Sequence, residues 1–456
     1  MDHPPEPRVK WPDAVFVILL AVFTGTLLHN TLYHNIWTGY DYRRHRASLR
    51  KNAKIGRLKD WKPRKGDGQM ESSPRLYYFL CGKTSALLQA ATGKKFPHVY
   101  TVIVANMIYM PLIAALFFFA LLPRSGLGSP HARLFIALSM FALPSMYLAQ
   151  VNTRGDHLLL FSLGLLLTLW FSADFHSRLP GSRWRKAAWC ILLIIMGNSR
   201  QTAAPAILLF LAWGAWLLIR AKIIPGTETR KIRCLTVCLI VLTSIGAGWP
   251  FLYRLSKTGR VLQRTDLEYH KKYYDLQVGF DRLPMFLNFE FHRLWERPNR
   301  RAEYGYGNNA VFPRLYGDMW ADHWLYFSGP QGGDREEEWK KMMLAVAAPF
   351  TVFYVFAPLI CALRGAALLR RGTPLDFPSA CGLLSVGAFC FLMIFVWFEP
   401  EVGKNSTVKF IYLLAYQWLP LFCMAELVKR RAALAYALAA YAGFLFAFGT
   451  PLHISP

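Results

Sequence analysis

The chain has few acidic residues. Its 456 residues include 27 Asp and Glu against 53 Lys and Arg, which gives a formal net charge of +26 at pH 7. It also lacks a disulfide framework and any Cys/His set at metal-ligand spacing, because seven of its eight cysteines lie in or at apolar segments and only Cys81 lies in a loop. No internal repeat, low-complexity tract or soluble catalytic domain is visible. The first apolar segment has no A-x-A-like end, so we expect a retained helix, not a cleaved signal peptide.

Hydrophobic residues, in contrast, make up 54% of the chain and form long runs. Most of these runs approach the roughly 20 residues that cross a bilayer as a helix. The sequence therefore predicts an all-α polytopic membrane protein with about 11 transmembrane helices and two long outer loops that contain interfacial helices. The expected spans are 14–33, 99–122, 134–149, 158–173, 187–197, 202–219, 234–253, 342–363, 377–398, 410–428 and 432–450. The short pair 187–197 and 202–219 can also be interpreted as a partly inserted hairpin.

The distribution of basic residues predicts the orientation. With the N-terminus inside, the inner segments carry 19 Lys and Arg and the short outer segments carry four, as the preference of cations for cytoplasmic loops requires. Both long loops are then outside by alternation, although 15 cations in the first of them conflict mildly with the preference. The predicted divisions are a cytoplasmic N-terminus (1–13), an N-terminal membrane module (14–253, with outer loop 34–98), a long outer loop (254–341) and C-terminal spans (342–456).

Several charged residues stand near the outer ends of predicted spans, where a charge is costly unless it is hydrated, paired or functional. Asp41 can be a hydrated loop residue paired with a neighbouring arginine; for this residue taken alone that interpretation is favoured, and spacing does not decide it. Asp156 can be an N-cap-like acid at the start of a helix or part of a site. Arg200 and Lys409 can be ordinary interface residues or ligands for a phosphate group.

The order of short motifs resembles the membrane glycosyltransferases of the GT-C fold, the superfamily of protein O-mannosyltransferases and bacterial aminoarabinose transferases. Four islands carry the resemblance: an acid after the first span followed by "G-x-L" and "P-x-L-Y-Y" elements, the hairpin "GNSRQTA", the stretch "LYGDMWADHW" and the span entry "STVKFIYLLAY". The first outer loop departs from the pattern because it is more basic, and arginines follow Asp41 where a second acid is usual. Each island is short, but together they follow the family's order along most of the chain.

The resemblance implies an enzyme that transfers a sugar from a polyprenyl-phosphate donor to a lipid, glycan or protein acceptor. The implied base is Asp41, with inversion at the anomeric carbon, and the implied ligands of the donor phosphate are Arg200 and Lys409. Substrate contacts are expected from Tyr42, Glu71, Tyr77, Tyr78, Arg154, Asp156, Asp318 and Tyr412. No metal ligand set is predicted; a divalent cation is compatible with the oxygen-rich acids, and the cofactor stays open.

Two other classes also explain a basic, apolar chain. A transporter or flippase for an anionic lipid-linked substrate would have inverted repeats and charges near the bilayer midplane, neither of which the sequence shows. A membrane scaffold would not need the ordered loop motifs. Nucleic acid is not an expected partner, because the cations are spread between membrane segments. The expected location is a bacterial inner membrane, a plasma membrane or the endoplasmic reticulum, with the active site on the periplasmic or lumenal side.

Overall fold

The fold is described from a computed structural model. The described residues are 11–33, 76–93, 108–149, 156–171, 183–221, 227–258, 286–287, 289–296, 298, 311–321, 334–398 and 410–453. Within them the chain is helical and contains no strand. The helices are α1 (Trp11–Tyr33), α3 (Leu76–Thr92), η2 (Leu116–Leu121), η3 (Leu122–Ser125), α5 (Pro130–Ser139), α6 (Pro144–Ala149), α7 (Asp156–Trp170), α9 (Arg183–Ser199), η4 (Gln201–Ala203), α10 (Ala204–Ala221), α11 (Thr227–Thr258), α14 (His292–Glu296), α15 (Val311–Ala321), α16 (Asp334–Arg370), α17 (Phe377–Phe398), η5 (Phe410–Tyr416), α18 (Leu419–Val428) and α19 (Ala432–His453).

The chain is an integral membrane protein by the length and composition of its helices. Among the described residues, five helical segments are long and apolar enough to cross a bilayer. They are Trp11–Asn30, Ile108–Ser125, Glu337–Arg370, Phe377–Ile394 and Ala432–Gly449. Five shorter apolar helices accompany them: His157–Trp170, Ala187–Ser199, Ala204–Ala215, Ile240–Pro250 and Leu413–Val428. The predicted all-helical membrane fold is confirmed, whereas the number of eleven spans is not.

The predicted span 134–149 is wrong as a single helix. The segment forms two short helices, with α5 ending at Ser139 and α6 beginning at Pro144. Proline has no N–H to donate, and its ring clashes with the preceding helical turn, so a helix that reaches Pro144 from the N-terminal side is interrupted there. The predicted span 410–428 is also divided, because it begins as the 3₁₀ helix η5 and continues as α18 after Trp418.

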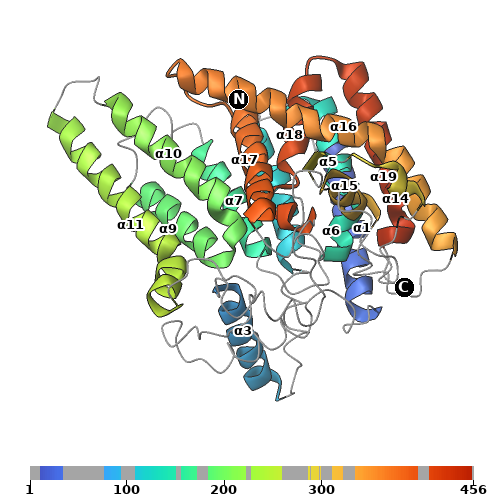
Figure 1. Ribbon diagram of the computed structural model, residues 1–456, viewed down its shortest axis with the longest axis horizontal. Coiled ribbons are helices and arrows are strands. Elements are labelled where there is room, and N and C mark those ends of the chain that lie inside the picture. Colours follow the sequence, from blue (N-terminus) through green and yellow to red (C-terminus); the bar gives the residue numbers. More distant parts are fainter. Residues whose placement is uncertain are drawn as a thin grey trace, which may run out of the picture.

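The helices form two neighbouring groups (Figure 1). Helices α7, α9, α10 and α11 lie together on one side, and α1, α5, α16, α18 and α19 lie on the other, with α17 between them. A continuous cluster of buried apolar side chains runs from α1 to α19 and includes Phe117, Trp418 and Phe422. The amphipathic helix α3 lies at one end of the bundle, away from the turn that joins α16 to α17.

Within the described residues, Gly382 and Gly197 each bring the backbones of two helices close together. A Cβ atom added at Gly382 of α17 would lie 2.6 Å from the backbone nitrogen of Ala362 and 2.7 Å from Cβ of Cys361, both in α16. A Cβ atom at Gly197 of α9 would lie 2.6 Å from the carbonyl oxygen of Ala247 in α11. Small residues let helix backbones approach closely inside a membrane, so these glycines set the distance between their helices.

Replacing Gly382 with alanine is expected to destabilise the contact between α16 and α17. The added methyl group meets backbone atoms that cannot rotate away, and overpacking of this kind typically costs about 1–3 kcal/mol. Gly387→Ala is the matched control on the same helix, since its new methyl group would meet only Cβ of Pro205 at an ordinary 3.7 Å. Thermal unfolding in detergent should show a lower Tm for Gly382→Ala than for the control. Equal Tm values would contradict the close approach.

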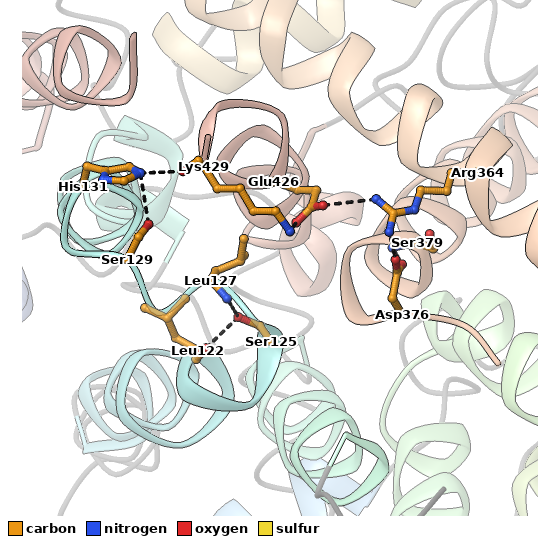
Figure 2. A network of polar contacts seen from close by, with 10 residues as sticks. All are labelled: Leu122, Ser125, Leu127, Ser129, His131, Arg364, Asp376, Ser379, Glu426 and Lys429. Carbon is orange, nitrogen blue, oxygen red and sulfur yellow. Dashed lines mark hydrogen bonds and ion pairs between the residues drawn. The ribbon is translucent and has the colours of Figure 1, made fainter. Parts of the chain in front are cut away.

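A set of polar contacts closes one end of the bundle (Figure 2). Arg364 of α16 pairs with Asp376, which precedes α17, and it donates to Glu426 of α18 at 3.1 Å. Nζ of Lys429 lies 2.6 Å from Oε2 of the same Glu426. The backbone carbonyl oxygen of Lys429 is 2.6 Å from Nε2 of His131 in α5. The contacts hold α5, α16, α17 and α18 together at the end that the basic-residue bias predicts to be cytoplasmic.

Candidate functional site

Helix α3 is docked by one face onto the ends of the helices that follow it. Tyr77, Tyr78 and Cys81 are nearly fully buried and form a small cluster with Leu158 of α7. The opposite face exposes Leu87, whose side chain is 72% exposed. An amphipathic helix with one docked and one open apolar face suits the boundary between protein, lipid and water. The packing of Tyr77 and Tyr78 against Leu158 brings α3 to the first turn of α7.

The docking of α3 predicts that Cys81 reacts slowly with a maleimide. Burial raises the pKa of the Cys81 thiol to about 12, and a hydrogen bond with Tyr77 offsets only part of this effect. The attacking species is the thiolate, which is scarce at neutral pH when the pKa is that high. Labelling of purified protein, followed by mass spectrometry, would compare Cys81 with a Leu87→Cys variant on the same helix. Labelling of Cys81 as fast as of the introduced thiol would contradict the docked position.

Arg200 lies in a turn that is fixed on both sides. Its backbone N–H donates to the carbonyl oxygen of Met196 at 3.3 Å, and its own carbonyl oxygen accepts the N–H of Ala203 at 3.2 Å. The side-chain amide of Asn198 donates to the carbonyl oxygen of Gly246 in α11 at 2.9 Å. The half-buried Arg200 therefore lies in a turn that is hydrogen-bonded to both α9 and α11. This turn is the polar tip "GNSRQTA" that the sequence singles out.

Asp318 is a buried carboxylate on the short helix α15, with 9% of its surface exposed. Its Oδ2 atom accepts the backbone N–H of Phe410, the first residue of η5, at 2.7 Å. Helix α15 is held on α16 by two bonds. Nε1 of Trp320 donates to the hydroxyl of Thr351 at 2.8 Å, and the hydroxyl of Tyr316 donates to the carbonyl oxygen of Leu344. Burial raises the pKa of Tyr316, so its hydroxyl stays protonated and able to donate.

The 3₁₀ helix η5 connects α15, which carries Asp318, with the turn that contains Arg200. At its start the N–H of Phe410 bonds Asp318, and at its end the hydroxyl of Tyr416 donates to the carbonyl oxygen of Thr202 at 2.5 Å. Thr202 follows Arg200 by two residues, and η5 also packs against α6, α7, α15 and α17. The motif islands around Arg200, Asp318 and Tyr412 are therefore neighbours in space, and α7, which begins at Asp156, lies beside them.

Two further buried charges lie near this junction and were missed by the sequence reasoning. Arg314 is 4% exposed and lies one helical turn before Asp318 on α15, whereas Lys340 is fully buried near the start of the α16 span. The contacts of Tyr316 with Leu344 and of Trp320 with Thr351 show that α15 and α16 run in the same direction. Lys340 therefore lies at the end of α16 that is next to the Arg314 end of α15. The available signal was the arginine inside the aromatic run "NNAVFPRLYGDMW".

The remaining predicted residues are not tested by this geometry. Asp41, Tyr42, Glu71, Arg154 and Lys409 lie outside the described residues. Asp156 is the first residue of α7 and Tyr412 lies within η5, but only the backbone of each is described. In the described part of the chain no group of three or more His, Cys, Asp or Glu side chains is arranged to hold a metal ion.

Comparisons with known proteins find similarity among solved structures. No known protein family matches the chain, and no curated protein matches it. Among solved structures the chain is similar to ArnT from Cupriavidus metallidurans in the apo state, with 11% identity and a TM-score of 0.36 over 91% of this chain and 77% of that one. This neighbour is an aminoarabinose transferase. At that TM-score the residues of the two chains are not paired one by one.

Proposed function

We propose that this protein is a membrane glycosyltransferase of the GT-C type that uses a polyprenyl-phosphate sugar as donor. The observation that supports it most is the convergence on η5. Motif islands that are more than 90 residues apart in the sequence, around Arg200, Asp318 and Phe410, are joined there by hydrogen bonds. Segments that match the family's motifs only by chance would not be expected to lie together in space, whereas the segments that form one active site must.

The proposed reaction is a single displacement at the anomeric carbon of the donor sugar. The acceptor hydroxyl forms the new C–O bond while the bond between the anomeric carbon and the phosphate oxygen breaks, and the phosphate leaves with the electron pair. Asp41 takes the hydroxyl proton as general base, and Arg200 and Lys409 stabilise the charge on the departing phosphate. Attack from the side opposite the phosphate inverts the anomeric configuration.

The other predicted residues are proposed to bind the substrates. Tyr42, Glu71, Arg154 and Asp156 follow or precede the same outer span ends and can donate to or accept from sugar hydroxyls. Tyr412 lies in η5 between the two hydrogen-bonded ends of that helix. The site would then open on the periplasmic or lumenal side, to which the basic-residue bias assigns these segments.

The positions of the buried charges favour a transferase over a transporter. In the described part of the chain the buried charged side chains are Arg133, Arg314, Asp318 and Lys340. Arg133 is near the start of α5, Lys340 is near the start of its span, and the other two lie on the short helix α15. A secondary transporter needs binding groups near the bilayer midplane, and none of these charges lies at the middle of an apolar helix.

A transfer assay tests the proposal. Purified protein in liposomes would receive a panel of polyprenyl-phosphate sugars, a nucleotide-sugar control and a membrane glycolipid extract as acceptor. Release of polyprenyl phosphate that requires the acceptor is the expected result. Transfer from the nucleotide sugar alone would overturn the assignment of the donor, and movement of labelled lipid between leaflets without any transfer would favour a flippase.

A further inference from the structure

We propose that the turn between α18 and α19, together with a furrow beside it, binds an anionic phospholipid of the inner leaflet. The headgroup phosphate would lie against Arg430 and Arg431, and the glycerol and acyl chains would lie along Trp11, Tyr436 and the outward face of α5. This lipid site is independent of sugar transfer. It lies at the end of the bundle away from α3, and none of its residues is assigned to the reaction.

The backbone of the cationic turn is held in place by its neighbours. The turn consists of Lys429, Arg430 and Arg431, which stand between α18 and α19. The N–H of Arg431 donates to the carbonyl oxygen of Val428 at 2.8 Å. The carbonyl oxygen of Lys429 is 2.6 Å from Nε2 of His131 in α5 (Figure 2). Arg430 and Arg431, which are both exposed, therefore extend from a fixed backbone.

The nearby carboxylates do not neutralise these two arginines. Asp376 and Glu426 both pair with Arg364 of α16 (Figure 2). Within the described part of the chain, neither Arg430 nor Arg431 forms an ion pair. Two adjacent guanidinium groups with uncompensated charge at a membrane surface attract anionic headgroups, and the planar fork of arginine matches two oxygens of a phosphate. Charge complementarity therefore favours an anionic lipid over a neutral one.

Two exposed aromatic rings lie next to the turn, at the level expected for headgroups. The rings of Trp11 in α1 and Tyr436 in α19 are stacked with 6.5 Å between their centroids, and the two residues are 50% and 42% exposed. The ring of Tyr436 also lies 6.0 Å from the ring of His131, which contacts the turn at Lys429. Tyrosine and tryptophan favour the boundary between membrane and water. Tyr436 follows Arg431 by five residues, roughly 7 Å along a helix, so the rings lie where the glycerol of a bound lipid would be.

The outward face of α5 forms the floor of a shallow furrow. Helix α5 packs against both α1 and α19, and its Leu138 is only partly buried. A Cβ atom added at Gly443 of α19 would lie 3.5 Å from Cδ2 of Leu138, so the glycine leaves space above this leucine. Gly443 follows Tyr436 by about two helical turns and shares its face of α19. Ile18, which is 63% exposed, follows Trp11 by the same interval on α1. An acyl chain that extends from the headgroup therefore meets an apolar path.

The chain offers a matched control for Arg430 and Arg431. Arg370 and Arg371 are a second adjacent pair of exposed arginines, at the end of α16. Helix α16 carries no part of the furrow, and Arg364 links it to α18 at this same end of the bundle. Replacing either pair with glutamine removes two charges from this end. A general attraction between the basic surface and anionic lipid is then weakened equally, whereas the proposed site is lost in only one variant.

Native mass spectrometry of the full chain in detergent tests the site. Phosphatidylglycerol and phosphatidylcholine are titrated separately, and the Kd of the first bound lipid is measured. Wild type is expected to bind phosphatidylglycerol about tenfold more tightly than phosphatidylcholine. Arg430→Gln/Arg431→Gln is expected to weaken phosphatidylglycerol binding about tenfold or more, since each cation near a headgroup contributes about fivefold. Arg370→Gln/Arg371→Gln should change it less than about threefold, because at about 0.15 M salt charges beyond about 8 Å are largely screened.

Two further measurements separate a lipid site from a simple phosphate site. Soluble glycerol phosphate carries the same charged group without acyl chains, so it should displace the lipid only at far higher concentration. Tyr436→Ala should weaken binding of both lipids several-fold and leave competition by glycerol phosphate unchanged. Unchanged Tm values without added lipid would verify that the variants are folded. Equal affinity of wild type for the two lipids, equal loss in the two arginine variants, or displacement by glycerol phosphate at lipid-like concentration would each overturn the site.

Discussion

Asp41→Asn is expected to reduce sugar transfer by about 10²- to 10⁴-fold, the range over which a general base accelerates proton removal. The amide keeps the size and shape of the carboxylate but cannot accept the proton of the acceptor hydroxyl at neutral pH. Binding of the donor should change little, because the proposed phosphate ligands are intact. The measurement is the rate of acceptor-dependent release of polyprenyl phosphate, with donor binding determined separately.

The same outer loop supplies a control for Asp41. Asp67→Asn removes an equal charge from the polar, basic part of loop 34–98, where no role in the reaction is expected. If both variants lose activity to the same extent, the effect would come from the charge of the loop. Normal turnover by a folded Asp41→Asn protein would refute the assigned base and leave Asp41 as a hydrated loop acid beside its arginines.

Apolar helices are the part of the fold that the sequence predicts well. The expected span 377–398 coincides with α17, Phe377–Phe398, and the expected span 432–450 differs from α19 only at its end. Hydrophobic burial and bilayer thickness determine these segments, and both can be estimated from composition. The expected span 342–363 underestimates α16, Asp334–Arg370, because charged residues end an apolar run without ending a helix.

The candidate site is predicted less completely, because it depends on backbone geometry and on distant partners. Composition does not show that residues 410–416 form a 3₁₀ helix, or that Asp318 and Thr202 bind its two ends. Motif order indicated Arg200 and Asp318 as site residues, but it gave no contact between their segments. The bonds to Phe410 and Tyr416 join residues 92 and 214 positions apart, a separation at which no local sequence pattern operates.

Removing either of the two proposed phosphate ligands is expected to produce the other large effect. Arg200→Ala and Lys409→Ala should each lower kcat/KM by about 10²-fold, as loss of one preorganised charge stabiliser does. Lys404→Ala is the control, since it removes a cation from the same predicted outer segment as Lys409. Arg200→Lys should recover only part of the activity, because lysine keeps the charge but lacks the planar fork that holds two phosphate oxygens.

Whether the loss of kcat/KM appears in KM or in kcat shows whether the cations act in donor binding or in the chemical step. A sugar linked to polyprenyl phosphate carries one negative charge on its phosphate diester, and the departing monoester gains a second. Contacts that strengthen as this charge develops lower kcat, whereas contacts of equal strength before and during the reaction change only KM. We therefore expect both parameters to worsen in Arg200→Ala and Lys409→Ala. A rise in KM alone would assign these cations to donor capture. The charge on the leaving phosphate would then need to be stabilised by other groups, for which the buried Arg314 and Lys340 are candidates.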